Sequence, residues 1–571
     1  MFFYNQYSKS VKFYTLMALL VSFLSSVSAQ DAVPKNWFHL DKSKDGFNGV
    51  SSDRTYKELL KGRKSKTVVV AILDSGVDAD HEDLKSVMWT NPKEIPNNGK
   101  DDDSNGYIDD IHGWNFIGGA NGNVDHDTYE TTRLYGKMKY KYETADRDKL
   151  TSKQKKEYDL FLKLRDEVEG RRKSAEANLA GINASEKQVM DAVNKVIEQL
   201  GTKEVNEMNL DAIDEGDSKS LSLGITIAKN LLENDPGIKS GDDLKKSIAK
   251  EFKEGKEHFS NELNYAFNPD FDSRKIVGDH YDDVNERIYG NNDVKGPDAR
   301  HGTHVAGLVG AVRNNNIGMN GIADNVRIMS VRCVPDGDER DKDIANAIRY
   351  AVDNGASIIN MSFGKGYSPN KDKIDEAVKY AAEHDVLLVH AAGNSAGNND
   401  KITNYPNRKF AKTSLFGKKK ASNWIEIGAL APNESPNLIA TFSNYGKKEV
   451  DLFSPGVLIY STVPDNQYEN LQGTSMASPI AAGVAAMLRS YFPTLTAKQI
   501  KDIIRKSTVK TNDLVLTPGT NKDAQLKEIS STGGIINAYN AVLLASKTKG
   551  KKKVKNWVEE GAIIPDQFVK P

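Results

Sequence analysis

Residues 67–76, with the sequence TVVVAILDSG, decide the fold of this chain. An unbroken run of β-branched and aliphatic residues is typical of a strand that is buried on both faces of a parallel sheet. Asp74 closes this strand, and open α/β sheets bind their ligands at the carboxyl ends of their strands. We therefore expect a buried parallel strand that presents Asp74 at the functional edge of a sheet.

Predicted strands and helices alternate through the second half of the chain. Apolar runs predict strands over 326–334, 356–361 and 386–392, and a 3.6-residue periodicity predicts helices over 343–354 and 373–384. Such alternation is typical of right-handed βαβ units. The sequence therefore predicts an α/β protein with a doubly wound, mostly parallel sheet.

Residues 128–267 interrupt this alternation. They are rich in Lys, Glu, Asp and Ala and contain no strand-like runs, whereas helical periodicity is evident over 153–174, 186–200 and 242–251. We interpret this stretch as a helical insertion in a discontinuous α/β domain. The remaining boundaries are an N-terminal segment at 30–66, the two parts of the α/β domain at 67–127 and 268–545, and a basic tail at 546–571.

The first 29 residues have the pattern of an export signal. Lys9 and Lys12 precede a short apolar run, and small residues lead up to Ala29. The run is too short to span a bilayer comfortably, so we expect cleavage after Ala29 rather than an uncleaved anchor, and no transmembrane span. The protein is expected to be secreted, periplasmic or at the cell surface.

Charge and cysteine content limit the classes of partner and the means of stabilisation. The 571 residues include 78 Lys and Arg against 79 Asp and Glu, so net charge gives no indication of a nucleic-acid partner. The basic tail is interpreted either as a solvated extension or as attraction to an anionic surface. The single cysteine, Cys333, is expected to be a buried strand residue, which leaves bound calcium as a means of holding loops in an exported chain.

Three residues supply the groups that serine hydrolysis requires. Ser475 lies in GTSMASP (473–479) at the start of an apolar helical run, where free N–H groups and the helix dipole favour negative charge. His301 opens HGTHVAG (301–307) and is the candidate base. Asp74 is the candidate acid that holds this base in the required tautomer. The sequence thus predicts an Asp74, His301 and Ser475 catalytic triad.

These three segments, with AAGN at 391–394, resemble the signatures of the subtilase family of serine proteases, in that family's chain order of Asp, His and Ser. The resemblance implies an endopeptidase that cleaves polypeptides through an acyl-enzyme, with broad specificity and a preference for an apolar residue before the scissile bond. It also implies that the side chain of Asn394 and the backbone N–H of Ser475 donate to the oxyanion. A catalytically silent binding module with the same fold is the alternative.

The same resemblance implies the residues that bind the substrate backbone. Ser362, Phe363 and Gly364 are expected to pair with an extended peptide, with Gly393 on the opposite wall of the primary specificity slot. The acidic stretch 336–341 lies where the family builds more distal substrate pockets. It is interpreted either as a solvated loop or as a surface that favours basic substrate residues.

Two calcium sites are expected. Asp101, Asp103 and Asn105 supply oxygen atoms at alternate positions before a turn glycine, and either Asp109 or Asp110 is available to close this loop. An acidic turn without a metal is the alternative. The family resemblance adds Asp83, which with residues 314–318 looks like the two halves of a second site.

Overall fold

The computed structural model describes residues 33–571 apart from 235–236, 413–416, 556, 558–560, 562 and 564–571. The expected export signal lies outside the described residues. The described chain divides into two compact units, one formed by residues 33–130 and 272–563 and the other by 131–271. The larger unit contains every predicted site residue.

The larger unit is built on a seven-stranded sheet in which all neighbouring strands are parallel. From edge to edge the strand order is β2, β5, β1, β6, β7, β8, β9. The bounds are β1 Val68–Asp74, β2 Gly113–Asn115, β5 Val326–Arg332, β6 Ile358–Met361, β7 Leu387–Ala391, β8 Trp424–Leu430 and β9 Leu452–Pro455. The prediction of a doubly wound α/β fold is therefore confirmed.

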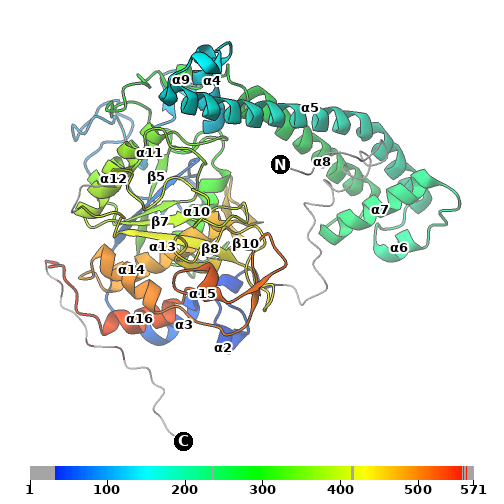
Figure 1. Ribbon diagram of the computed structural model, residues 1–571. Coiled ribbons are helices and arrows are strands. Elements are labelled where there is room, and N and C mark those ends of the chain that lie inside the picture. The colour runs from blue at the N-terminus through cyan, green and yellow to red at the C-terminus, as the bar shows by residue number, and fades with distance from the viewer. Residues whose placement is uncertain are drawn as a thin grey trace, which may run out of the picture. The chain divides into compact units, whose positions relative to one another are not determined.

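Helices cover both faces of this sheet (Figure 1). Alternate residues of β1 point into two separate cores, because successive side chains of a strand point to opposite faces. Val70 and Ile72 join the core formed with α10 and α13, whereas Ala71 and Leu73 join the core formed with α11 and α12. The helix bounds are α10 Arg300–Gly310, α11 Asp341–Asp353, α12 Lys371–Glu383, α13 Thr474–Tyr491, α14 Ala497–Lys506 and α16 Ala538–Ser546.

Short elements complete the larger unit. The short helices are η1 Trp37–His39, α2 Lys42–Asp45, α3 Ser52–Thr55, η2 Tyr56–Leu60, α9 Arg274–Val277 and α15 Leu526–Ile529. Three antiparallel hairpins pair β3 Gly118–Gly119 with β4 Gly122–Asn123, β10 Ile459–Val463 with β11 Gln467–Leu471, and β12 Val515–Leu516 with β13 Asp523–Ala524. None of the helices among the described residues is both long and apolar enough to cross a membrane.

The smaller unit is helical, as predicted, but its longest helix is longer than any helix predicted from the sequence. The stretches 153–174 and 186–200 belong to one continuous helix, α5 Ser152–Leu200, of 49 residues. The alanine-rich stretch between them contains no proline to end the helix. The other helices are α4 Glu130–Tyr142, which begins in the larger unit, η3 Arg147–Lys149, α6 Glu207–Asp211, α7 Lys219–Asn234, α8 Gly241–Asn261 and η4 Glu262–Ala266.

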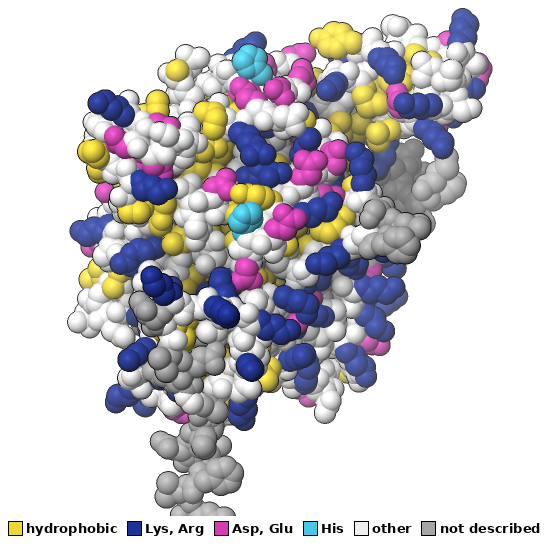
Figure 2. Space-filling model, turned by 90° about the vertical axis from the view of Figure 1, so that its left-hand side faces the viewer, with side chains coloured by type: hydrophobic (Ala, Val, Ile, Leu, Met, Phe, Trp, Pro, Cys, Tyr) yellow, Lys and Arg dark blue, Asp and Glu magenta, His cyan; other side chains and the backbone are white. Residues whose placement is uncertain are grey.

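The start of the basic tail is attached to the larger unit. The backbone N–H of Lys552 donates to the carbonyl of Thr494 at 2.9 Å, and its ammonium lies 3.1 Å from Asp385. Lys and Arg side chains also predominate over the lower part of the face shown in Figure 2, although the net charge of the chain is only −1.

Candidate active site

Asp74 and His301 meet at the carboxyl end of β1. His301 lies in the first turn of α10, and its Nδ1 is 2.6 Å from Oδ1 of the buried Asp74. The same oxygen accepts the N–H of Ser75 at 2.8 Å. A Cβ at position 302 would lie 2.1 Å from the carbonyl oxygen of Gly76, so the glycine after His301 allows α10 to approach the strand this closely.

This contact fixes the chemistry of the imidazole. Because the Asp74 carboxylate accepts a hydrogen bond, Nδ1 of His301 carries the proton and Nε2 of the neutral ring is left as a base. Burial by itself would lower the pKa of His301, but the negative charge of Asp74 and the hydrogen bond to it raise that pKa above its ordinary value. The negative charge of Asp74 therefore stabilises the imidazolium form of His301.

Ser475 lies in the first turn of α13, at the same edge of the sheet. Its hydroxyl donates to the carbonyl of Ser362 at 3.2 Å, and no hydrogen bond joins it to His301 among the described residues. In return, the Ser362 hydroxyl donates to the Ser475 carbonyl at 2.9 Å. Transfer of the Ser475 proton to His301 therefore requires rotation of the Ser475 side chain, as is common in apo structures.

Two hydrogen-bond donors converge beside Ser475. The amide oxygen of Asn394 accepts both the N–H and the hydroxyl of Thr474, each at 2.9 Å, so its Nδ2 points away from Thr474. A Cβ at position 473 would lie 3.4 Å from Nδ2 of Asn394 and 3.5 Å from the backbone N of Ser475. Gly473, at φ +151°, keeps this space open. Two nitrogen donors that lie beside one open position meet the requirement for binding an oxyanion.

Comparison with known proteins agrees with this geometry. The profile of the subtilase family matches residues 65–530. The chain belongs to the subtilase family. Among curated relatives, a thermophilic serine proteinase of Bacillus sp. (strain AK1) is 37% identical over 281 residues, which cover 48% of this chain and 58% of the relative.

Other relatives of this subtilase match shorter parts of the chain. Subtilisin DY of Bacillus licheniformis is 38% identical, with 37% of this chain and 70% of the relative covered. Thermitase of Thermoactinomyces vulgaris is 36% identical, with 42% and 74% covered. A solved protease structure from Pseudoalteromonas arctica matches 45% of this chain and 79% of that chain at a TM-score of 0.36 and 25% identity.

The second histidine of the HGTHVAG segment has a structural position in this subtilase. His304 is buried, and its Nε2 donates to the carbonyls of Ile459 at 2.9 Å and Glu469 at 3.2 Å. Burial lowers the pKa of His304 to about 3, so its ring is neutral. It ties α10 to the β10–β11 hairpin and does not contact Asp74 or Ser475.

The expected substrate-binding segments lie close to Ser475. Ser362 is buried, Phe363 is half-buried and Gly364 is exposed, immediately after the end of β6. A Cβ at Gly364 would lie 2.6 Å from Oδ1 of Asn404, and one at Gly393 would lie 3.5 Å from Nδ2 of the same side chain. The uncharged side chain of Asn404 therefore lies close to both Gly364 and Gly393.

The acidic stretch 336–341 is only partly solvated. Asp336 is exposed, but Glu339, Arg340 and Asp341 are buried. The solvated-loop interpretation is therefore wrong for these three residues. They are buried because Arg340 pairs with Asp127 at 2.7 Å and Asp341 pairs with Lys365 at 2.9 Å.

The first calcium candidate is an acidic loop between β1 and β2. Carboxylate oxygens of Glu94, Asp101 and Asp103 lie within 4.8 Å of one another. Hard carboxylate oxygens clustered in this way fit the ligand preference of calcium. Asp101 also accepts the N–H of Gly106 at 2.8 Å, so the turn glycine orders this loop as predicted.

Asn105 and Asp110 adjoin this cluster, because the backbone N–H of Asn105 donates to Asp101 and Asp103 and the Asn91 amide donates to both Asp103 and Asp110. Asp110 is buried and accepts hydrogen bonds from Tyr350 at 2.6 Å and Asn91 at 2.7 Å, and burial raises its pKa to about 6. The amide oxygen of Asn105 accepts the N–H of Tyr107 at 2.8 Å. The side-chain oxygens that sequence analysis offered at these two positions thus take part in internal hydrogen bonds.

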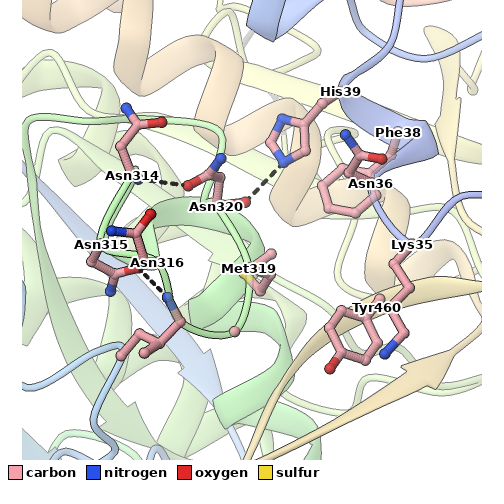
Figure 3. A pocket seen from close by; sticks show the side chains of 12 residues that line it. Lys35, Asn36, Phe38, His39, Asn314, Asn315, Asn316, Met319, Asn320 and Tyr460 are labelled. Atoms are coloured by element: carbon pink, nitrogen blue, oxygen red, sulfur yellow. Dashed lines mark hydrogen bonds between the residues drawn. The ribbon is translucent and has the colours of Figure 1, made fainter.

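Asp83 contacts the loop with which it was paired. Its carboxylate accepts Nδ2 of Asn315 at 2.6 Å and the N–H of Met319 at 3.2 Å. The same loop borders a cavity of about 430 Å³, which is lined on one side by Asn314, Asn315 and Asn316 and on the other by His39 and Tyr460 (Figure 3). Calcium binding beside Asp83 would require the Asn315 amide to turn its oxygen toward the carboxylate, because the amide presents its NH₂ group there.

Sequence reasoning missed several residues that support these sites. Glu94 precedes the acidic loop by seven positions and gave no spacing signal. Asn360 links the active-site segments, because it donates to Ser362 at 2.9 Å and accepts the hydroxyl of Ser478 at 2.7 Å. Asn444 accepts the N–H of Ser395 at 3.0 Å and so shapes the loop after Asn394. The bonds from Ser478 to Asn360 and from Ser395 to Asn444 join segments that are distant in sequence, so they become evident only once the chain is folded.

Proposed function

We propose that this subtilase is a serine endopeptidase with Asp74, His301 and Ser475 as its catalytic triad. The observation that carries the proposal is the 2.6 Å contact between buried Asp74 and His301, at the sheet edge where Ser475 begins α13. Membership of the subtilase family supports it. The chain spans 58% of the first relative's length, so the activity is proposed for this chain on its own residues.

The proposed mechanism follows from the positions of these groups. As Oγ of Ser475 bonds to the scissile carbonyl carbon, Nε2 of His301 takes its proton and Asp74 stabilises the imidazolium. The carbonyl oxygen becomes an oxyanion that accepts hydrogen bonds from Asn394 and the backbone N–H of Ser475. The carbon–nitrogen bond then breaks, and His301 gives the proton to the leaving amine.

The second half of the reaction uses the same groups. A water molecule gives a proton to His301 as its oxygen attacks the acyl carbon, and a second oxyanion forms in the same position. Collapse of this intermediate breaks the ester bond, and His301 returns the proton to Oγ of Ser475. Protons and bonds therefore balance over one cycle of peptide hydrolysis.

We further propose that the substrates are polypeptides with an uncharged, apolar residue before the scissile bond. The uncharged lining around Gly364, Gly393 and Asn404 supports this preference. An extended peptide would pair with residues 362–364, by addition of a strand. Broad specificity follows, because main-chain hydrogen bonds do not depend on the side chains of the substrate.

Export and calcium binding complete the proposal. The secreted-type signal at residues 1–29 indicates an exported enzyme. Glu94, Asp101 and Asp103 would hold a structural calcium ion, which would cross-link the loop between β1 and β2. Such an ion would stabilise the folded state by mass action, because the unfolded chain does not preserve the cluster.

Purified wild-type, Ser475→Ala and His301→Ala proteins test the proposal with casein and a short chromogenic peptide. Both variants should lose about 10⁶ in kcat, a magnitude taken over from subtilisin. Ser475→Ala should keep the wild-type melting temperature, whereas His301→Ala should lower it, because it leaves the buried Asp74 carboxylate without its partner. Wild-type turnover in either variant would refute the triad. An inactive wild-type protein that still binds peptides would instead establish the silent binding module.

A further inference from the structure

Lys365 follows directly after the proposed substrate-binding segment, residues 362–364. Its side chain is buried, and its ammonium lies 2.8 Å from Glu130 and 2.9 Å from Asp341. The Lys365 backbone exchanges two hydrogen bonds with Tyr405, at 2.8 and 2.9 Å. A buried ammonium is costly unless it is paired, so Lys365 and Glu130 depend on each other. Glu130 is the first residue of α4, the helix that leads into the insertion.

Arg340 connects both ends of the insertion to the other side of the proposed cleft. Its guanidinium makes a bidentate pair with Asp127, at 2.7 and 2.9 Å, just before the chain leaves the larger unit. It also donates to the hydroxyl of Ser273 at 3.3 Å, just after the chain returns. The guanidinium lies 4.5 Å from the ring centre of Tyr281. Arg340, Asp127 and Ser273 are all buried.

Backbone hydrogen bonds join residues 125–127, where the chain leaves the larger unit, to residues 333–336, and these in turn are bonded to Asp74. The N–H groups of Cys333 and Val334 donate to the carbonyl of Asp74, at 3.0 and 3.2 Å. Two residues later, Asp336 donates to the carbonyl of Asp125 at 2.9 Å and accepts the N–H of Asp127 at 2.8 Å. Residues 125–127 therefore lie beside residues 333–336 as a short strand partner.

The returning chain is held equally firmly. Arg274, which begins α9, pairs with Asp343 at 2.8 Å and with Asp279 at 2.6 Å. Asp343 lies in the first turn of α11, the helix that follows Arg340. Arg274, Asp279 and Asp343 are buried, so these pairs are shielded from solvent and from screening by salt.

We propose that Arg340 and Lys365 are positioning residues that couple the two ends of the insertion to the acyl side of the substrate cleft. An extended peptide would bind between residues 333–340 and residues 362–365. Displacement of either end of the insertion, at Asp127–Glu130 or at Ser273, would move these two segments. A partner that binds the insertion would thereby change affinity for long substrates, and long substrates would change the dynamics of both ends in return. This inference rests on the proposed function.

Kinetics with peptides of increasing length test the coupling. We would compare full-length wild type, Lys365→Met and Lys365→Arg on chromogenic peptides with one to five residues before the scissile bond. Lys498→Met is the matched control, because Lys498 also pairs with a carboxylate, Asp502 at 2.6 Å, but on the surface. In the wild type and the control, KM should fall as the peptide lengthens.

Lys365→Met should raise KM for the longest peptide on the order of tenfold and change kcat by less than about twofold. This pattern indicates the loss of binding energy that the substrate and the transition state share. Lys365→Arg should retain most of the wild-type length dependence. A loss that is equal at every length, or no loss at all, would overturn the inference. If the wild type cleaves no peptide, the proposed function itself fails.

Hydrogen exchange provides a second test that does not require the Lys365 variant to fold. The full-length Ser475→Ala protein would be compared with and without the longest peptide. Bound peptide should slow amide exchange in residues 125–130 and 272–276 as well as in 362–365. Protection confined to 362–365 would show that the cleft and the ends of the insertion are independent, and would overturn the inference.

Discussion

Replacement of Asn394 by alanine is the most specific test of the proposed oxyanion site. The Asn394 side chain is exposed, and its two hydrogen bonds from Thr474 both use the amide oxygen. The variant therefore removes the Nδ2 donor and leaves the N–H of Thr474 without its acceptor. The lost acceptor should lower the free energy of unfolding by about 1 kcal/mol, while the core is unaffected.

The effect on catalysis should be much larger than the effect on stability. In subtilisin, removal of the corresponding donor lowers kcat by about 10²–10³, or about 2.7–4 kcal/mol of transition-state stabilisation, and we take that magnitude over. KM should change little, because the oxyanion exists only in the transition state and the intermediates. Steady-state hydrolysis of a short chromogenic peptide, with thermal unfolding of the same preparations, separates the two effects.

Gly473→Ala tests the same proposed oxyanion position by placing a methyl group beside it. Its methyl group would lie 3.4 Å from Nδ2 of Asn394 and 3.5 Å from N of Ser475, the two donors that we propose for the oxyanion. We expect a loss of kcat at least as large, and a double variant that is little worse than either single variant, because both changes remove one site. If Asn394→Ala keeps kcat within about threefold of wild type, or acts on KM alone, the assigned role is wrong.

Three further predictions concern pH, the insertion and calcium. Because Asp74 raises the pKa of His301, kcat/KM should fall as pH drops through that raised value, and Asp74→Asn should move this acidic limb to lower pH; an unmoved limb would contradict the pairing. Replacing residues 131–271 with a Gly-Ser linker should preserve cleavage of a small peptide and change cleavage of folded proteins, whereas loss of small-peptide activity in a folded variant would place the insertion in the active site. EDTA should lower the melting temperature of an inactive variant and calcium should restore it, with a weaker response in Asp103→Ala; a metal-free protein that melts identically with and without calcium would leave the acidic loop a simple turn.

The parts of the fold that depend on local patterns were predictable from the sequence. Buried strands such as 68–74 read as continuous apolar runs because both faces of a parallel sheet are covered. The length of α5 was underestimated, because the stretch near residue 180 contains Gly181, Asn183 and Ser185, which have low helix propensity but are tolerated inside the packed helix. The insertion also begins later than the predicted boundary at residue 128, because Glu130 is buried against Lys365 and belongs to the larger unit.

The candidate site divides along the same line. Asp74, His301 and Ser475 could be proposed because each ends a strand or begins a helix with a distinctive local sequence. The hydrogen bond from Ser475 to Ser362, and the positions of Asn360 and Glu94, could not be proposed, because their partners are brought together only by the tertiary fold. Ion pairs between distant segments, such as Arg340 with Asp127, have no periodic signature and made a buried stretch look solvated.

Covalent labelling of the nucleophile tests the central claim most directly. A fluorophosphonate reacts with a serine whose hydroxyl is activated by a neighbouring base, and peptide mapping by mass spectrometry locates the adduct. We expect one adduct, at Ser475, in the wild-type chain, and its loss in His301→Ala at the same protein concentration and pH. An active protein that is labelled at another residue, or that is labelled at Ser475 equally well without His301, would contradict the proposed triad.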